Sequence, residues 1–149
     1  MKRINEYKKL FNVEKDINLK EIKTKYRNLV KEWHPDKFQN EEAMCIEAER
    51  MSRVIIDAYH FLVSIAPETI AANSEAYNVT ISEVGIYDYK HKGMTLEVHF
   101  ADSSVYEYFG VSRAMFNKMN NAGNLERFAR RNIFKSFLYR KSKKAMEAA

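Results

Sequence analysis

The chain has 149 residues, of which 46% are hydrophobic and 30% charged, with a formal net charge of +5, and this composition is typical of a soluble globular protein of one or two small domains. No apolar run approaches the roughly 20 residues that a transmembrane helix needs, and the basic N-terminus lacks the apolar core of a secretory signal. The single cysteine, Cys45, excludes an internal disulfide and agrees with a reducing cytoplasm.

Helical periodicity predicts a short helix over residues 5–11 and a longer one after it. The longer helix should begin at Asn18, a good N-cap, with Glu21 three residues later as in a capping box. Apolar residues then recur at helical spacing as far as Trp33. The opposite side of this helix carries a row of cations, which are Lys20, Lys23, Arg27 and Lys31.

The second helix ends at the tripeptide His34, Pro35 and Asp36. Because proline disfavours helical backbone in the residue before it, we expect the last helical residue to be Trp33 or His34. A third helical pattern begins near Glu41. A corner this short predicts that the two long helices pack as an antiparallel hairpin with the tripeptide at its tip.

The second half of the chain begins with a short helical pattern over 67–72 and a polar segment, 73–78, that has the character of a linker. The spacing of apolar residues then changes from the 3.6-residue repeat of a helix toward the two-residue repeat of a strand. This predicts a three-stranded antiparallel meander, with strands over 84–87, 95–100 and 105–111 and a turn over 88–93. Two helices should follow, the first capped by Ser112 and the second beginning near Leu125.

These patterns predict a protein of two modules. The first is an all-α domain over residues 1–72, built around the helical hairpin. A linker over 73–78 leads to a small α+β domain over 79–142, in which the meander precedes two helices. Residues 143–149 are predicted to be a basic, flexible tail.

The tripeptide at the corner has two interpretations. In the first it only ends the second helix, because histidine is favourable at a helix C-terminus and proline stops a helix. In the second it binds a partner, since a rigid tip with one carboxylate, beside a row of cations, suits complementary charges on another protein. The tripeptide alone favours the first interpretation, and its place at the tip of a hairpin favours the second.

The first half of the chain resembles a J domain. The segments EYKKLFNV, EIKTKYRNLVKEWHPDK and IIDAYHFL are similar to the first, second and third helices of that family and cover roughly residues 5–65. The resemblance implies a co-chaperone that binds a DnaK-type chaperone and stimulates its ATP hydrolysis. The residues that it implies for binding are His34, Pro35, Asp36, Lys23, Tyr26, Arg27 and Lys31.

The second half resembles a KTSC domain over roughly residues 79–139. The resemblance rests on the YD pair, the strand LEVHF and the motif YEYFGV. This domain is found in bacteria and at the C-terminus of some lysyl-tRNA synthetases. The resemblance therefore implies a bacterial protein and hints at RNA. We expect the protein in the cytoplasm, in agreement with its single cysteine.

Positive charge is concentrated near the C-terminus, where residues 125–144 carry eight Lys and Arg side chains against a single Glu. A solvated helix face explains this block without any ligand. Alternatively, the block binds phosphate groups, with Tyr106, Tyr108 or Tyr139 available for base stacking. The cations of that nucleic-acid surface would be Arg127, Arg130, Arg131, Lys135 and Arg140.

The sequence contains no pattern that indicates catalysis. Its histidines and Cys45 show no paired metal-ligand spacing, and it has no glycine-rich phosphate loop. We therefore expect no catalytic residue, no metal and no cofactor.

Two functions follow from these observations. In the first, the chain is a co-chaperone of a DnaK-type chaperone, and its second domain recognises a client or partner protein. In the alternative, it is an RNA-binding protein whose J domain recruits the chaperone. Neither function involves a membrane.

Overall fold

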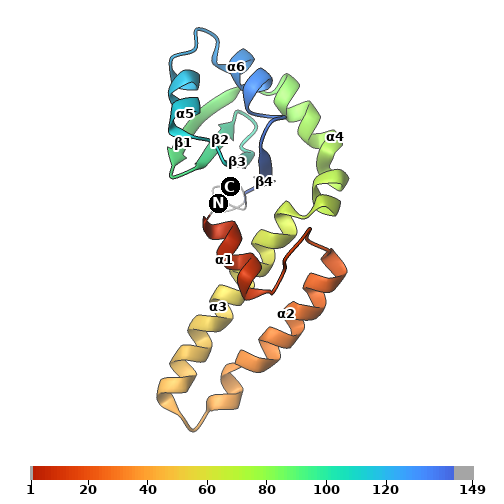
Figure 1. The fold of residues 1–149 in the computed structure, drawn as a ribbon, viewed down its shortest axis with the longest axis vertical. Helices are drawn as coiled ribbons and strands as arrows, with labels where there is room; N and C mark the ends of the chain where they lie inside the picture. The colour runs from red at the N-terminus through yellow and green to blue at the C-terminus, as the bar shows by residue number, and fades with distance from the viewer. Residues whose placement is uncertain (1, 143–149) are drawn as a thin grey trace. The chain divides into compact units, whose positions relative to one another are not determined.

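The computed structural model describes residues 2–142, which form two compact units, an N-terminal unit of Lys2–Thr69 and a C-terminal unit that begins at Ile70 (Figure 1). The helices that come first are α1 (Lys2–Leu10), α2 (Leu19–Trp33), the short 3-10 helix η1 (Pro35–Phe38) and α3 (Glu42–Ile65). The elements that follow are α4 (Pro67–Glu83), β1 (Ile86–Lys92), β2 (Thr95–Phe100), β3 (Val105–Phe109), α5 (Arg113–Asn120), α6 (Leu125–Asn132) and β4 (Leu138–Lys141).

Local chemistry determines both ends of α2. At its start, Asn18 has an extended backbone, and its side-chain oxygen accepts a hydrogen bond from the backbone N–H of Glu21 at 3.1 Å. At its end, Pro35 forces His34 into an extended conformation with ψ of 127°, so Trp33 is the last helical residue. The predicted N-cap and the predicted end of this helix are confirmed.

The N-terminal unit is built on the antiparallel hairpin of α2 and α3, with η1 at its tip (Figure 1). Ile22 of α2 and Ile55 and Leu62 of α3 are completely buried. Burying an aliphatic side chain of this size contributes about 1.5–3 kcal/mol. The rings of Tyr7 on α1 and Phe61 on α3 meet edge to face at 5.3 Å, so α1 packs onto the same helix.

The C-terminal unit contains one antiparallel sheet with the strand order β1-β2-β3-β4. A two-residue turn joins β1 to β2, and its first residue, Gly93, has a φ of 61°. A left-handed residue at this position gives the turn the twist that adjacent antiparallel strands need, and glycine adopts it without steric cost.

Helices α4, α5 and α6 all pack against one face of this sheet (Figure 1). Alternate residues of β2 and β3 point into this core, where they meet residues such as Tyr77 of α4 and Met119 of α5. The Tyr77 hydroxyl donates a hydrogen bond to the Phe134 carbonyl at 2.6 Å and lies 3.0 Å from the Tyr108 hydroxyl. This buried network ties α4 to β3 and to the segment after α6.

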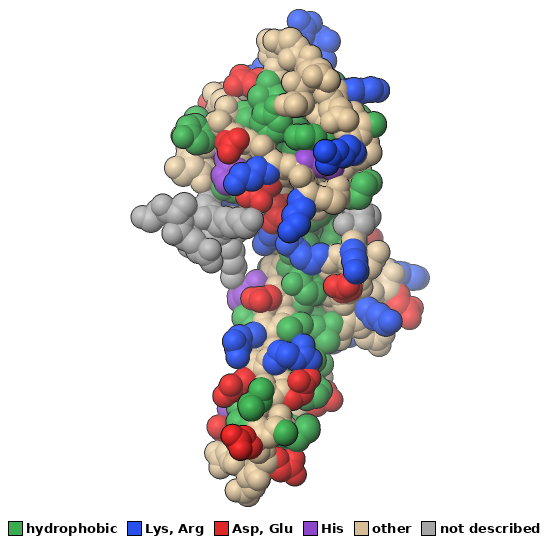
Figure 2. All heavy atoms as spheres, turned by 90° about the vertical axis from the view of Figure 1, so that its left-hand side faces the viewer, with side chains coloured by type: hydrophobic (Ala, Val, Ile, Leu, Met, Phe, Trp, Pro, Cys, Tyr) green, Lys and Arg blue, Asp and Glu red, His purple; other side chains and the backbone are tan. Residues whose placement is uncertain are grey.

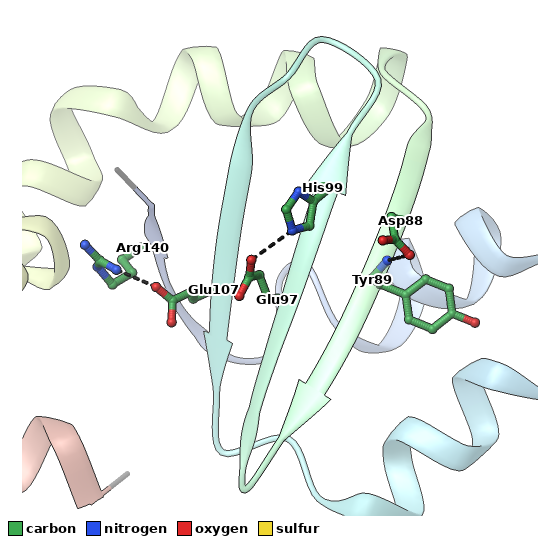
Figure 3. Close-up of polar contacts among 6 residues, drawn as sticks. All are labelled: Asp88, Tyr89, Glu97, His99, Glu107 and Arg140. Carbon is green, nitrogen blue, oxygen red and sulfur yellow. Dashed lines mark hydrogen bonds and ion pairs between the residues drawn. The ribbon is translucent and has the colours of Figure 1, made fainter. Parts of the chain in front are cut away.

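The opposite face of the sheet carries charged side chains (Figure 3). The strand register aligns Lys90, Glu97, Glu107 and Arg140 in one row across all four strands. Two carboxylates facing each other across neighbouring strands repel. Two neighbouring side chains offset this repulsion. The Arg140 guanidinium bonds the Glu107 carboxylate at 2.5 Å, and His99 bonds the Glu97 carboxylate at 2.8 Å.

The structure corrects the predicted linker. Residues 73–78 lie within α4, which runs to Glu83 rather than ending near residue 72. Tyr77, Thr80 and Ile81 follow one another at helical spacing and are buried, so tertiary packing holds as helix a segment whose polar composition is typical of a loop. The boundary between the two units falls after Thr69, inside the first turn of α4.

The structure also changes the details of the predicted sheet. The first strand is β1, and it includes most of the segment that was predicted to be a turn, 88–93. The last predicted helix ends at Asn132, and residues 138–141 form a fourth strand that pairs with β3. This pairing satisfies the backbone groups of β3, which would otherwise be a long apolar edge strand. The overall prediction of a helical module followed by an α+β module is confirmed. The predicted tail, 143–149, lies outside the described residues.

Candidate functional site

The predicted binding tripeptide forms the corner between α2 and η1. His34 is the N-cap of η1, and its Nδ1 atom accepts a hydrogen bond from the backbone N–H of Asp36 at 3.2 Å. His34 therefore organises the corner through the backbone of Asp36 and leaves the carboxylate of that residue uncommitted.

The Asp36 side chain is 76% exposed, and that of His34 is 51% exposed. The Asp36 carboxylate lies 3.5 Å from His34 Nδ1, the atom that also accepts the backbone bond. No Lys or Arg of residues 2–142 lies within ion-pair distance of Asp36. The carboxylate is therefore open to a cationic donor on another molecule.

Contacts from both long helices hold the corner in place. The Ser52 hydroxyl on α3 donates a hydrogen bond to the carbonyl of Trp33, the last residue of α2, at 3.2 Å. Across the corner, the rings of Trp33 and Phe38 lie 6.5 Å apart. Ser52 thus joins α3 directly to the residue that precedes His34. The sequence contains no signal for this contact, because the two residues lie 19 positions apart on different helices.

The cations predicted on α2 form one exposed row. Lys23, Arg27 and Lys31 recur at intervals of four residues and are all exposed. Tyr26 differs from them, because it is half-buried and its ring stacks on Tyr59 of α3 at 4.1 Å. The hairpin therefore presents three of the four predicted helix residues to solvent and uses the fourth mainly for packing.

Another surface of the N-terminal unit is mixed in charge. The side shown in Figure 2 carries acidic and basic side chains next to one another along its length. On α3, Arg50 pairs with Glu47 at 2.6 Å. The row of cations on α2 is therefore a distinct electropositive feature of this unit, and it leads toward the corner with Asp36.

The structure separates the cations that were predicted to bind nucleic acid. Arg127, Arg131 and Lys135 are exposed. Arg130 is partly engaged, since its Nε donates to the Ile81 carbonyl at 3.2 Å and its Nη2 lies 3.7 Å from Glu126. Arg140 lies on β4 and is 7% exposed, unlike these three exposed cations (Figure 3). Its guanidinium compensates the buried charge of Glu107 instead.

The tyrosines proposed for base stacking belong to the core. Tyr106 and Tyr108 are buried, and Tyr139 stacks on Tyr77 with ring centroids 3.8 Å apart. Burial raises the pKa of both Tyr106 and Tyr108, because an ionised phenol would be poorly solvated there. Burial closes Tyr106 and Tyr108 to a base, and the half-buried Tyr139 already stacks on Tyr77. The exposed aromatic ring is that of Tyr87, at 82%, and the sequence pattern does not distinguish it from its neighbours.

Two family models match the chain. Residues 6–68 match the DnaJ domain, and residues 82–137 match the KTSC domain. No curated protein and no solved structure matches the chain significantly. None of the described helices is by itself long and apolar enough to cross a membrane, although the bent pair of α3 and α4 passes that test by length and composition.

Proposed function

We propose that this protein, a DnaJ domain followed by a KTSC domain, binds a DnaK-type chaperone through its corner tripeptide and the basic face of α2, and stimulates its ATP hydrolysis. The DnaJ domain supports a co-chaperone role in general. The observation that carries the specific proposal is the exposed Asp36 carboxylate. The corner presents it beside the row Lys23, Arg27 and Lys31, and no Lys or Arg of residues 2–142 pairs with it.

The two parts of the site have different tasks. The cations on α2 attract an acidic surface of the chaperone and speed the encounter, and added salt weakens such an attraction. Asp36 then makes a charge-assisted hydrogen bond, for which an arginine is the best-matched donor. This bond accelerates hydrolysis only if it is stronger in the hydrolysis-competent state of the chaperone than in its resting state. The chain itself supplies no catalytic residue.

We further propose that the KTSC domain recognises a client or partner protein, so that the chaperone is activated where that protein is bound. One experiment tests the first part. ATP turnover by a DnaK-type chaperone is measured with increasing amounts of the wild-type protein and of Asp36→Asn. The proposal requires that the wild-type protein raises the turnover and that the substituted protein does not.

A second candidate function is nucleic-acid binding, with the J domain recruiting the chaperone to the bound RNA. The exposed cations of α6 favour it, since Arg127 and Arg131 lie four residues apart on the solvent side of a short helix. Phosphate contacts of this kind carry no sequence preference by themselves. Binding to RNA across a salt series tests this function, and absence of binding at low salt would exclude it.

A further inference from the structure

Tyr87 is a large aromatic side chain that is exposed to solvent instead of packing in the core. At 82% it is the most exposed large hydrophobic residue of the part of the chain that the structure describes. The register of β1 against β2 shifts between Ile86 and Asp88, so Tyr87 is the residue that the strand ladder leaves unpaired. A bulge of this kind re-aims a side chain out of the regular alternation of a strand. The phenol ring is therefore presented to solvent from a fixed point of the backbone.

A hydrogen bond ties this bulge to the start of α6. The Glu126 carboxylate accepts from the backbone N–H of Ile86 at 3.2 Å. Gly85 leaves room for that carboxylate, because a Cβ at this position would lie only 3.0 Å from it. Tyr87 follows Ile86, whose backbone N–H donates this hydrogen bond, and Arg127 follows Glu126, whose carboxylate accepts it. Standard backbone and side-chain dimensions place the Cα atoms of Tyr87 and Arg127 within about 17 Å of each other, which a few nucleotides can span.

The solvent side of α6 next to this bond carries cations without internal partners. Arg127 and Arg131 are neighbours on the helix surface, and Lys135 follows the helix. No carboxylate in residues 2–142 lies within ion-pair distance of any of these three side chains. They differ in this from Arg130 and Arg140, which the fold uses for its own contacts.

We propose that Tyr87, Arg127 and Arg131 form a binding surface for single-stranded nucleic acid. The two guanidinium groups contact phosphates, and the Tyr87 ring stacks on an unpaired base. An acidic protein segment would satisfy the arginines but would leave the ring without a flat partner, so the combination favours nucleic acid. This inference rests on the second candidate function, and it specifies the residues and the form of nucleic acid.

The test uses the full chain and labelled oligonucleotides of one length, which are oligo(U), oligo(dT) and a mixed-sequence RNA duplex. Binding is followed by fluorescence anisotropy from low to moderate salt. The variants are Tyr87→Ala, Tyr87→Phe and the double substitution of Arg127 and Arg131 by Gln. Lys15→Gln with Arg53→Gln is the matched control, because it removes two exposed cations of the N-terminal unit that lie outside both proposed sites.

We expect the single strands to bind more tightly than the duplex. Tyr87→Ala should weaken single-strand binding about tenfold, whereas Tyr87→Phe should retain it, because the ring still stacks. The double arginine variant should lower the slope of log affinity against log salt by roughly 1.4, the value for two lost phosphate contacts on a single strand. The control variant should bind as the unsubstituted protein does.

Four results would overturn the inference, and only the first also excludes the second candidate function. If the unsubstituted protein binds none of the oligonucleotides at low salt, the second candidate function fails with it. If it binds but Tyr87→Ala has no effect, or the duplex binds as tightly as the single strands, only the inference fails. If poly-glutamate displaces the oligonucleotides at equal charge concentration, the surface binds an acidic protein instead. None of these results affects the proposed co-chaperone function.

Discussion

At the scale of single residues, the Asp36 carboxylate and the Arg140 guanidinium show how differently two charged side chains are used. The backbone N–H of Asp36, not its carboxylate, makes the bond to His34 that organises the corner. Substitution by Asn therefore changes the charge and leaves the local bond in place. Arg140, by contrast, is buried against Glu107, and its charge serves the fold.

Removing the charge of Arg140 should destabilise the C-terminal unit. Arg140→Met leaves the Glu107 carboxylate buried without its cation, and loss of one partner of a buried pair costs about 3–5 kcal/mol. Arg131→Met is the matched control, because Arg131 is exposed and its substitution should change stability by less than about 0.5 kcal/mol. Urea unfolding followed by tyrosine near-UV circular dichroism measures the difference. Equal stability of the two variants would contradict the structural role of Arg140.

The buried tyrosines predict a loss of stability at alkaline pH. Burial raises the pKa of Tyr77 and of Tyr108 above the ordinary value of 10.0. The unfolded chain therefore releases these protons at a lower pH than the folded chain does. The stabilisation is complete below about pH 10 and decreases as the pH rises above it, because the unfolded state is then favoured by ionisation.

A pH titration of tyrosinate absorbance, recorded together with near-UV circular dichroism, checks this expectation. Tyr108→Phe should remove absorbance from the step that accompanies unfolding. Tyr87→Phe should remove absorbance that appears earlier, while the fold is intact, because its ring is exposed. If the absorbance of Tyr108 appears while the dichroism is still native, the buried network is not as the structure describes it.

At the scale of elements, the row of cations on α2 should control how fast the partner is found. Lys23→Gln combined with Arg27→Gln should raise the concentration of co-chaperone needed for half-maximal stimulation, and should leave the maximal rate nearly unchanged. The same variant should be less sensitive to salt than the unsubstituted protein. Arg53→Gln on α3 is the control, since it removes an exposed cation from a surface of mixed charge. An unchanged half-maximal concentration would rule out the steering function of α2.

The contact between Ser52 and Trp33 should matter for the geometry of the corner. Ser52→Ala removes a hydrogen bond worth about 1 kcal/mol between α3 and the end of α2, and up to about a fivefold loss of maximal stimulation is expected. Ser74→Ala on α4 removes a comparable hydroxyl bond to the Ala71 carbonyl and should have no effect on stimulation. Fluorescence of Trp33, the single tryptophan of the chain, reports whether the corner has changed. Unaltered fluorescence and full stimulation would show that Ser52 does not position the corner.

Elements whose signals are local could be predicted from the sequence, and elements that depend on distant partners could not. The cap at Asn18, the stop at Pro35 and the cap at Ser112 each depend on residues within one turn, and the structure contains all three. The fourth strand and the continuous α4 depend on β3 and on the buried side of Tyr77, respectively. A short stretch of sequence does not predict such elements, because the residues that stabilise them lie far away along the chain.

At the scale of the whole molecule, the same limit applies to the candidate sites. The exposure of the corner follows from a proline between two helical patterns, so its residues could be named from the sequence. On the C-terminal unit, the pattern of charge alone did not separate the buried Arg140 from the exposed Arg127, nor the buried tyrosines from Tyr87. Which side of a strand faces the core depends on register, and a single bulge changes it.

The central claim is that the Asp36 carboxylate acts on the hydrolytic step of a DnaK-type chaperone. Single-turnover hydrolysis of chaperone-bound ATP tests it most directly, because nucleotide exchange does not limit the measured rate. We expect the unsubstituted protein to accelerate this single turnover and Asp36→Asn, with unchanged circular dichroism, to leave it at the basal rate. Equal acceleration by the two proteins would show that the Asp36 carboxylate does not act on the hydrolytic step.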